Sequence, residues 1–137
     1  MASEIRTDEF PDELAARLFE QAWCVRQNAY VIGPTKVGCA VMGTDGRIHA
    51  GCNVEHRFRS HDIHAEVNAI SSMVTAGGTK LRAVAIAAER ERFTPCGSCM
   101  DWIMQFADDD CVVLAQNRIG GPVQAYTAHD LMPYYPR

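Results

Sequence analysis

The sequence lacks long apolar runs and lacks an excess of positive charge. No stretch approaches the roughly 20 consecutive apolar residues that cross a bilayer, and the start, Met1-Ala2-Ser3-Glu4-Ile5-Arg6, lacks the charged-then-apolar order of a signal peptide. The 17 Asp and Glu outnumber the 13 Lys and Arg, so the net charge is −4 and the pI is about 5.7. Nonspecific affinity for nucleic acid needs clustered Lys and Arg. We therefore expect a cytoplasmic protein that binds a small molecule and neither a membrane nor nucleic acid.

Internal repeats, linkers and low-complexity segments are also missing. The 137 residues, 47% of them hydrophobic, suit one ordinary domain, so we predict a single domain over residues 1–137. The six cysteines do not need to pair, because a chain with this apolar content needs no disulfide staples. Four of them lie in apolar patterns and are predicted to be small core residues: Cys24, Cys39, Cys52 and Cys111.

Apolar residues recur at helical spacing in some segments and form short runs of strand length in others. Helices are predicted over about residues 11–29, from 62–64 to 77, and over 95–106, and strands over 36–42, 48–54, 81–88, 111–115 and 123–127, with a loop at 55–63 and a turn or short helix at 128–132. Asp45-Gly46 between the first two strands is typical of a hairpin turn. Helices inserted between strands predict an α/β fold, a three-layer α/β/α sandwich with a central five-stranded mixed sheet.

Three potential metal ligands lie at the starts of two predicted helices. His64 lies at the start of one helix, and Cys96 and Cys99 lie where the other begins. One His and two Cys supply three of the four ligands of a tetrahedral Zn²⁺, and a catalytic zinc keeps its fourth position for water. Glu66 follows His64 by two residues and could carry protons. This pattern predicts a hydrolytic zinc site.

The spacing of these residues suits the end of a helix better than its flank. Residues i and i+2 of a helix point about 200° apart, so His64 and Glu66 cannot meet on one side of it. Both can reach a point beyond the N-terminal end. The same end favours the thiolate form of Cys96 and Cys99, because its N–H groups and dipole attract negative charge. We therefore expect two helix N-termini to converge on one ion.

Other interpretations of these residues remain open. A lone C-x-x-C pair that follows an apolar strand and opens a helix is also typical of a thioredoxin-like redox pair, and a structural zinc or redox module without hydrolysis is the alternative class. His61 competes with His64 as the ligand, because the two are three residues apart, but Glu66 favours His64. The remaining histidines are interpreted as ordinary surface or loop residues: His49, His56 and His129.

The combination of His-x-Glu with Pro-Cys-x-x-Cys resembles the signature of the cytidine deaminase superfamily. The similarity runs from about residue 29 to 133 and is closest to the small homotetrameric nucleoside deaminases, which include cytidine deaminase and blasticidin-S deaminase. Further segments carry it: Lys36-Val37-Gly38-Cys39-Ala40, Asp45-Gly46-Arg47-Ile48, Gly51-Cys52-Asn53-Val54-Glu55 and Asp130-Leu131-Met132-Pro133. The resemblance implies a homotetramer and a hydrolase of pyrimidine salvage. Its substrate would be cytidine, deoxycytidine or a modified cytosine nucleoside, which it would deaminate with release of ammonia.

The resemblance also implies roles for individual residues. His64, Cys96 and Cys99 would bind Zn²⁺, and Glu66 would carry protons. The substrate would be bound by four further residues: Asn53 and Glu55 at the ribose hydroxyls, and the Ala65 N–H and Thr94 carbonyl at the pyrimidine edge. A purine or nucleic-acid deaminase shares His-Ala-Glu and is the alternative enzyme, which the acidic charge and Asn53-Val54-Glu55 disfavour.

The chain departs from the family at three points. Tetrameric members usually carry Cys-Ala-Glu-Arg where this chain has His64-Ala65-Glu66-Val67, so a thiolate and an arginine are lost together. The aromatic residue that packs on the base is missing near Thr35. Arg57 and Arg59 enter a loop that is usually uncharged, either as solvated or subunit-bridging residues or as ligands of an anionic or enlarged sugar. A contribution of Tyr134 and Tyr135 to the pocket is a further expectation from the resemblance.

Overall fold

The architecture was analysed in a computed structural model that describes residues 10–136. Its elements are α1 (Asp12–Arg26), β1 (Val37–Gly43), β2 (Ile48–Cys52), the 3-10 helix η2 (Arg59–His61), α2 (Ala65–Thr75), β3 (Leu81–Ala88), α3 (Gly97–Phe106), β4 (Ala107–Gln116), β5 (Val123–Thr127) and α4 (Ala128–Leu131). No helix in this part of the chain is long and apolar enough to cross a membrane. The prediction about Met1–Arg6 lies outside the described residues.

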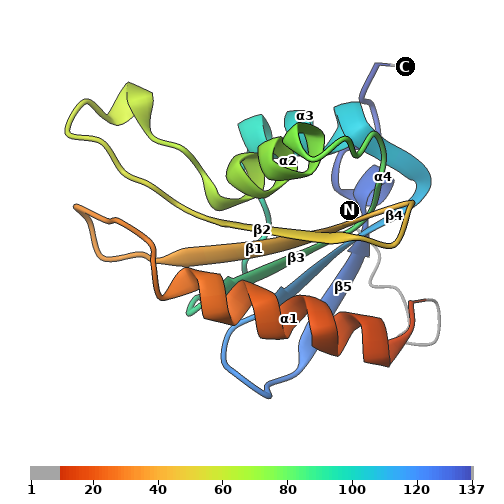
Figure 1. Cartoon of the computed structure of the whole chain (residues 1–137), viewed down its shortest axis with the longest axis horizontal. Helices are drawn as coiled ribbons and strands as arrows, with labels where there is room; N and C mark the ends of the chain where they lie inside the picture. The colour runs from red at the N-terminus through yellow and green to blue at the C-terminus, as the bar shows by residue number, and fades with distance from the viewer. Residues whose placement is uncertain (1–9, 137) are drawn as a thin grey trace.

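The five strands form one sheet in the order β2-β1-β3-β4-β5. The β3–β4 pair is parallel and the other three pairs are antiparallel, so the sheet is mixed. Figure 1 shows α1 on one face and α2, α3 and α4 on the opposite face. The predicted three-layer sandwich with a five-stranded mixed sheet is therefore confirmed.

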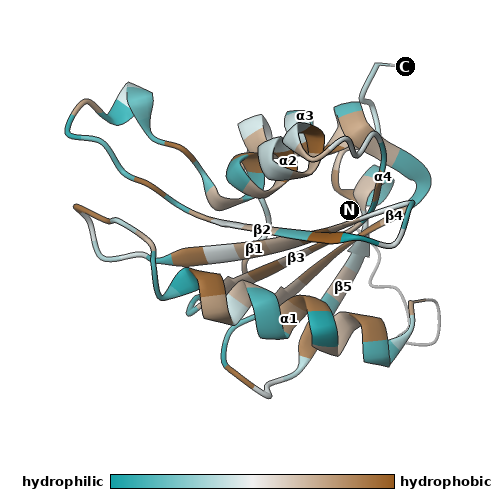
Figure 2. Ribbon diagram, in the orientation of Figure 1, coloured by the Kyte–Doolittle hydropathy of each residue, from teal (hydrophilic) through white to brown (hydrophobic). Residues whose placement is uncertain are grey.

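The central strand β3 is buried on both faces, as Figure 2 shows by its apolar colouring between the helical layers. Successive side chains of a strand point to opposite faces. Val84 and Ile86 pack in the core on the side of α2 and α3, whereas Ala83, Ala85 and Ala87 pack in the core under α1. The three alanines leave room for the larger side chains of α1 on that face.

Two glycines let the helices approach the sheet closely. A Cβ atom on Gly38 would lie 2.0 Å from the carbonyl oxygen of Ala22 in α1, and one on Gly51 would lie 2.6 Å from the amide nitrogen of Ala69 in α2. Atoms at these distances overlap, so only glycine fits at either position. The contact at Gly51 fixes α2, the helix that begins after His64, against the sheet.

Several boundaries and exposures differ from the sequence predictions. The strand β4 begins at Ala107 and not at 111, because the acidic segment before Cys111 continues the strand. Cys24 is exposed, so its prediction as a core residue is wrong: α1 turns Leu18, Ala22 and Trp23 towards the sheet, and the neighbouring position turns outward. The other three predicted core cysteines are buried, and all six cysteines, each within the described chain, are free thiols.

Candidate metal centre and substrate pocket

The three predicted ligands meet at the N-termini of two helices. His64 is the N-cap residue of α2 and Cys96 is the N-cap residue of α3, while Cys99 lies in the first turn of α3. The Nδ1 atom of His64 lies 3.2 Å from Sγ of Cys99 and 3.5 Å from Sγ of Cys96. All three ligand atoms lie within 4.8 Å of one another, and no other such group of three occurs among the described residues.

These distances suit a tetrahedral zinc ion. Zn–N bonds of about 2.0 Å and Zn–S bonds of about 2.3 Å, at the tetrahedral angle, place nitrogen and sulfur roughly 3.5 Å apart. The backbone N–H of Cys99 also points to Sγ of Cys96 at 3.4 Å, a contact that favours the thiolate form. The donor set and its spacing therefore fit Zn²⁺. His61 lies outside this group, in the exposed loop, with its ring 4.9 Å from that of His56.

Burial controls the protonation of the groups around the metal position. Cys99 is fully buried, and burial, followed by the negative charge of Glu66, raises the pKa of its thiol. A metal ion that binds Cys99 must therefore displace a proton, which makes metal loading dependent on pH. Burial also raises the pKa of Glu66, whose side chain is 3% exposed. A raised pKa makes the carboxylate a better proton acceptor.

A pocket of about 280 Å³ extends from the metal-ligand group to the loops that follow α1 and β2. The four residues that the resemblance assigns to the substrate line it, and so does Arg59, one of the two candidate arginines; the four are Asn53, Glu55, Ala65 and Thr94. His64, Glu66 and Cys96 line the same pocket, and Cys99 lies buried behind them. The structure thus brings the predicted metal ligands, the predicted proton carrier and the predicted substrate contacts to one cavity.

Asn53 anchors the chain at the sheet end of this pocket. Its Oδ1 accepts a hydrogen bond from the Val37 N–H at 2.9 Å, and its Nδ2 donates to the Thr35 carbonyl at 3.0 Å. The side chain is almost fully buried. An amide offers two donors and two acceptor lone pairs, so residues 10–136 leave one of each for a ligand.

Glu55 connects the two loops at the far end of the pocket. Its Oε1 accepts hydrogen bonds from the N–H groups of Ile32 at 2.7 Å and Gly33 at 2.8 Å. Its Oε2 forms an ion pair with Nη2 of Arg59 at 3.1 Å. The backbone hydrogen bonds, first that of Gly33, hold the pKa of Glu55 below its usual value. The carboxylate is therefore negatively charged near neutral pH and fixed in place.

The remaining candidates lie elsewhere. The Arg57 guanidinium stacks on the Phe58 ring at 5.4 Å and does not line the pocket. Tyr134 is 97% exposed, and neither it nor Tyr135 is among the pocket residues. Two of the three histidines interpreted as surface or loop residues are partly buried in regular structure, His49 in β2 and His129 in α4, whereas His56 is exposed in the loop.

Sequence reasoning missed Phe93. This half-buried aromatic residue lines the pocket from the loop before α3 and packs against the core on the α2 and α3 side. Thr35, the position where the expected aromatic residue is missing, lines the same pocket. The available signal was its place in the sequence, directly before Thr94-Pro95-Cys96. Arg90, Asp62 and Ile63 are pocket residues that the sequence reasoning also left out.

A larger groove on the other face of the sheet has a different character. It measures about 640 Å³, lies between α1 and the strands β4 and β5, and is lined mainly by apolar side chains such as Phe19, Trp23 and Leu114. None of the three metal-ligand candidates lines it. The smaller pocket therefore carries the chemistry.

Three protein ligands at a zinc position, with a buried carboxylate beside them, fit the class of zinc-dependent hydrolases. Comparison with known proteins narrows this class. The family model for the cytidine and deoxycytidylate deaminase zinc-binding region matches residues 12–115. The chain belongs to this family.

Individual relatives agree with this assignment. A cytidine deaminase of Sporosarcina psychrophila is 31% identical over 85% of this chain and 87% of its own length. The crystal structure of cytidine deaminase from Burkholderia pseudomallei has a TM-score of 0.79 at 29% identity and covers 88% of this chain and 97% of that one. The cytidine deaminase structure from Mycobacterium tuberculosis has a TM-score of 0.73 at 26% identity and covers 86% and 93%. The zinc-binding family and the His/Cys/Cys group together identify Zn²⁺ as the cofactor.

Proposed function

We propose that the protein is a zinc-dependent cytidine deaminase, a hydrolase that converts a cytosine nucleoside and water into the uracil nucleoside and ammonia. The observation that carries this proposal is the position of Glu66, a buried carboxylate in the pocket that also holds His64 and Cys96. Cytidine deaminases from several organisms, similar to this chain in sequence and in fold, support the choice of substrate. The substrates proposed are cytidine, deoxycytidine or a modified analogue.

The metal end of the pocket performs the reaction. His64, Cys96 and Cys99 would hold Zn²⁺, which would supply the Lewis acidity that brings the pKa of a water molecule towards neutrality. Glu66 accepts a proton from the attacking water and donates it to ring N3 as the oxygen adds to C4. It then takes the remaining proton of that oxygen, which becomes the C4 carbonyl, and delivers it to the exocyclic amine, which leaves as ammonia. Burial suits Glu66 to this work, because it excludes bulk water and raises the pKa of the carboxyl, which makes the carboxylate a better acceptor of the proton from water.

The other pocket residues hold the substrate. The backbone N–H of Ala65 and the carbonyl of Thr94 bind the edge of the pyrimidine, and Phe93 packs on the base in place of the aromatic residue missing near Thr35. The sugar end is formed by Asn53, Glu55 and Arg59, which offer hydrogen-bond donors and acceptors to hydroxyl groups.

Wider features of the proposal follow from the family resemblance. We propose that residues 1–137 form one deaminase domain, that the protein acts in the cytoplasm in pyrimidine salvage, and that it assembles as a homotetramer. Light scattering coupled to gel filtration measures the last point directly. A mass of about four chains of 15.1 kDa supports the tetramer, and the mass of a single chain contradicts it.

A substrate panel with metal analysis tests the proposed reaction. Ammonia release is measured with cytidine, deoxycytidine, adenosine, guanosine and a single-stranded oligonucleotide. We expect turnover of the cytosine nucleosides, loss of turnover after chelation, and recovery with added Zn²⁺. Preferred turnover of a purine nucleoside or of the oligonucleotide supports the alternative deaminase classes. Bound zinc without ammonia release from any substrate supports a non-catalytic zinc module and overturns the proposal.

A further inference from the structure

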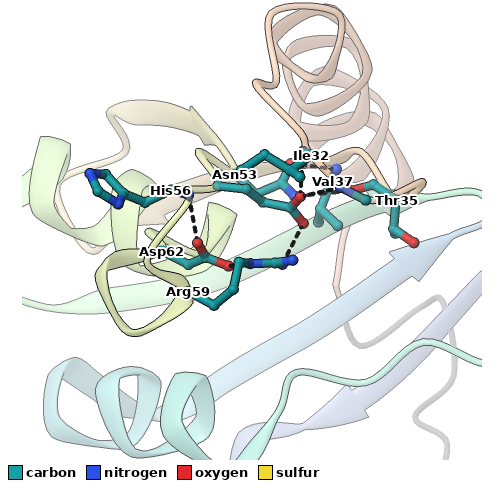
Figure 3. A network of polar contacts seen from close by, with 9 residues as sticks. Ile32, Thr35, Val37, Asn53, His56, Arg59 and Asp62 are labelled. Carbon is teal, nitrogen blue, oxygen red and sulfur yellow. Dashed lines mark hydrogen bonds and ion pairs between the residues drawn. The ribbon is translucent and has the colours of Figure 1, made fainter.

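Arg59 is held by two carboxylates at the sugar end of the pocket (Figure 3). Its Nε donates to Oδ2 of Asp62 at 2.9 Å, and its Nη2 lies 3.1 Å from Oε2 of Glu55. Asp62 is itself fixed, because its Oδ1 accepts the His56 N–H at 2.6 Å. The Glu55 and Asp62 side chains are each 12% exposed, whereas the Arg59 side chain is 56% exposed. The guanidinium is therefore anchored along one edge and open on the other.

Both Glu55 and Arg59 can form further hydrogen bonds at their contact. Oε1 of Glu55 already accepts two backbone N–H groups, and Oε2 forms only the ion pair with Arg59 among the described residues, so Oε2 can accept a further hydrogen bond. A guanidinium has five N–H groups, and within residues 10–136 Arg59 uses its Nε–H in a hydrogen bond and its Nη2 in the ion pair. A free acceptor thus lies next to free donors, and a hydroxyl group can satisfy both at once.

The charge of the cluster disfavours an anionic ligand. Arg59 carries one positive charge, whereas Glu55 and Asp62 carry two negative charges and contact the same guanidinium. A phosphate or carboxylate placed on the free edge of Arg59 would lie close to both carboxylates, where like charges repel strongly. A neutral hydroxyl avoids this repulsion and still receives a charge-assisted hydrogen bond.

We propose that Arg59 and Glu55 together read one sugar hydroxyl, which donates to Oε2 of Glu55 and accepts from Arg59. This inference rests on the proposed function and deepens it, because it names the substrate class as neutral nucleosides with that hydroxyl intact. Arg59 is then a specificity-determining residue. It rejects analogues in which the hydroxyl is missing, since their binding leaves the fixed donor and acceptor unpaired.

Turnover of deoxy analogues tests the inference. The ratio of kcat/KM is measured for cytidine against its 2′-, 3′- and 5′-deoxy forms and against cytidine 5′-monophosphate, in the wild type and in Arg59→Met. We expect the wild type to reject one deoxy form at least about tenfold and the monophosphate more strongly. Arg59→Met should lower the discrimination against that deoxy form by at least about threefold, and Glu55 should retain the remainder. Arg57→Met is the matched control and should keep the wild-type ratios, because Arg57 stacks on Phe58 outside the pocket.

Each contrary outcome has a separate meaning. An Arg59→Met variant that loses the same factor with every substrate assigns Arg59 to loop structure and overturns the inference. A preference for the monophosphate that disappears in Arg59→Met shows that the residue reads an anion, which also overturns it. Arg59→Lys keeps a positive charge between the two carboxylates and provides the test if Arg59→Met does not fold. Its ratio of kcat/KM for cytidine and the deoxy form should lie between unity and the wild-type ratio. Absence of turnover with every nucleoside overturns the proposed function, whereas turnover with unchanged ratios overturns this inference alone.

Discussion

The two ends of the pocket are built in different ways. The metal end lies at the N-termini of α2 and α3, with Cys99 and Glu66 buried. The sugar end lies on the loops after α1 and β2, which extend beyond the sheet in Figure 1 and are connected through Glu55 and Arg59. Regular structure thus holds the groups proposed to carry the reaction, and loops hold the groups proposed to select the substrate. Loops tolerate sequence change better than buried helix ends do, so a change of substrate can leave the reaction intact.

Removal of a buried metal ligand should have the largest effect. Cys99→Ala should abolish stoichiometric zinc binding and reduce ammonia release by at least about 1000-fold, because two ligands cannot hold a catalytic zinc in place. Metal analysis of the purified variant and an ammonia assay measure both effects. The matched control is Cys24→Ala, on the exposed side of α1, which should keep zinc and activity. Full zinc content in Cys99→Ala would contradict the assignment of the metal end.

Truncation of the pocket aromatic should have a smaller effect, mainly on substrate binding. Phe93→Ala should raise KM for cytidine by roughly tenfold and change kcat less, because the aromatic contact with the base is present before and during the reaction. The KM of Phe93→Leu should lie between those of the wild type and Phe93→Ala. Phe58→Ala is the control, since Phe58 is exposed and outside the pocket. An unchanged KM in Phe93→Ala would show that Phe93 does not contact the base.

Acid should weaken the sugar end through Glu55. Because the pKa of Glu55 is lower in the folded chain than in the unfolded chain, its contribution to stability is present above the unfolded pKa of about 4.3. The contribution is lost as the pH falls through the lower folded pKa. Urea unfolding of the wild type and of Glu55→Gln between pH 7 and 3 measures it. We expect the difference in unfolding free energy between the two to shrink as the pH falls, and a constant difference would contradict this origin.

The parts of the site that rest on regular spacing were open to prediction from the sequence. At a helix start, the local spacing alone limits where neighbouring side chains can reach. The spacing of His64 and Glu66, and of Cys96 and Cys99, therefore predicted that these side chains meet beyond the helix ends, as the structure shows. The strand β3 was predicted with its observed bounds, because an apolar run of that length, closed by polar residues, has few other interpretations.

The loops were not predictable in the same way. Residues 55–63 have no period, so nothing in the sequence places the Arg59 guanidinium between Glu55 and Asp62. Phe93 lines the pocket because of the course of another irregular loop, the one before α3. Family resemblance supplied Asn53 and Glu55 as candidates but not their hydrogen bonds. These contacts depend on tertiary structure, which local patterns do not encode.

The variant Glu66→Gln tests most directly whether Glu66 serves the reaction and not the binding of substrate. The change keeps the shape of the side chain and leaves the zinc ligands and the sugar end untouched. We predict that the zinc-loaded variant binds cytidine with a dissociation constant, measured by calorimetry, within a few-fold of the wild-type KM. We also predict that it releases ammonia at least about 1000-fold more slowly than the wild type, as expected for loss of the proton carrier. Ammonia release at a rate near that of the wild type would contradict the assignment of Glu66, and with it the account of the metal end.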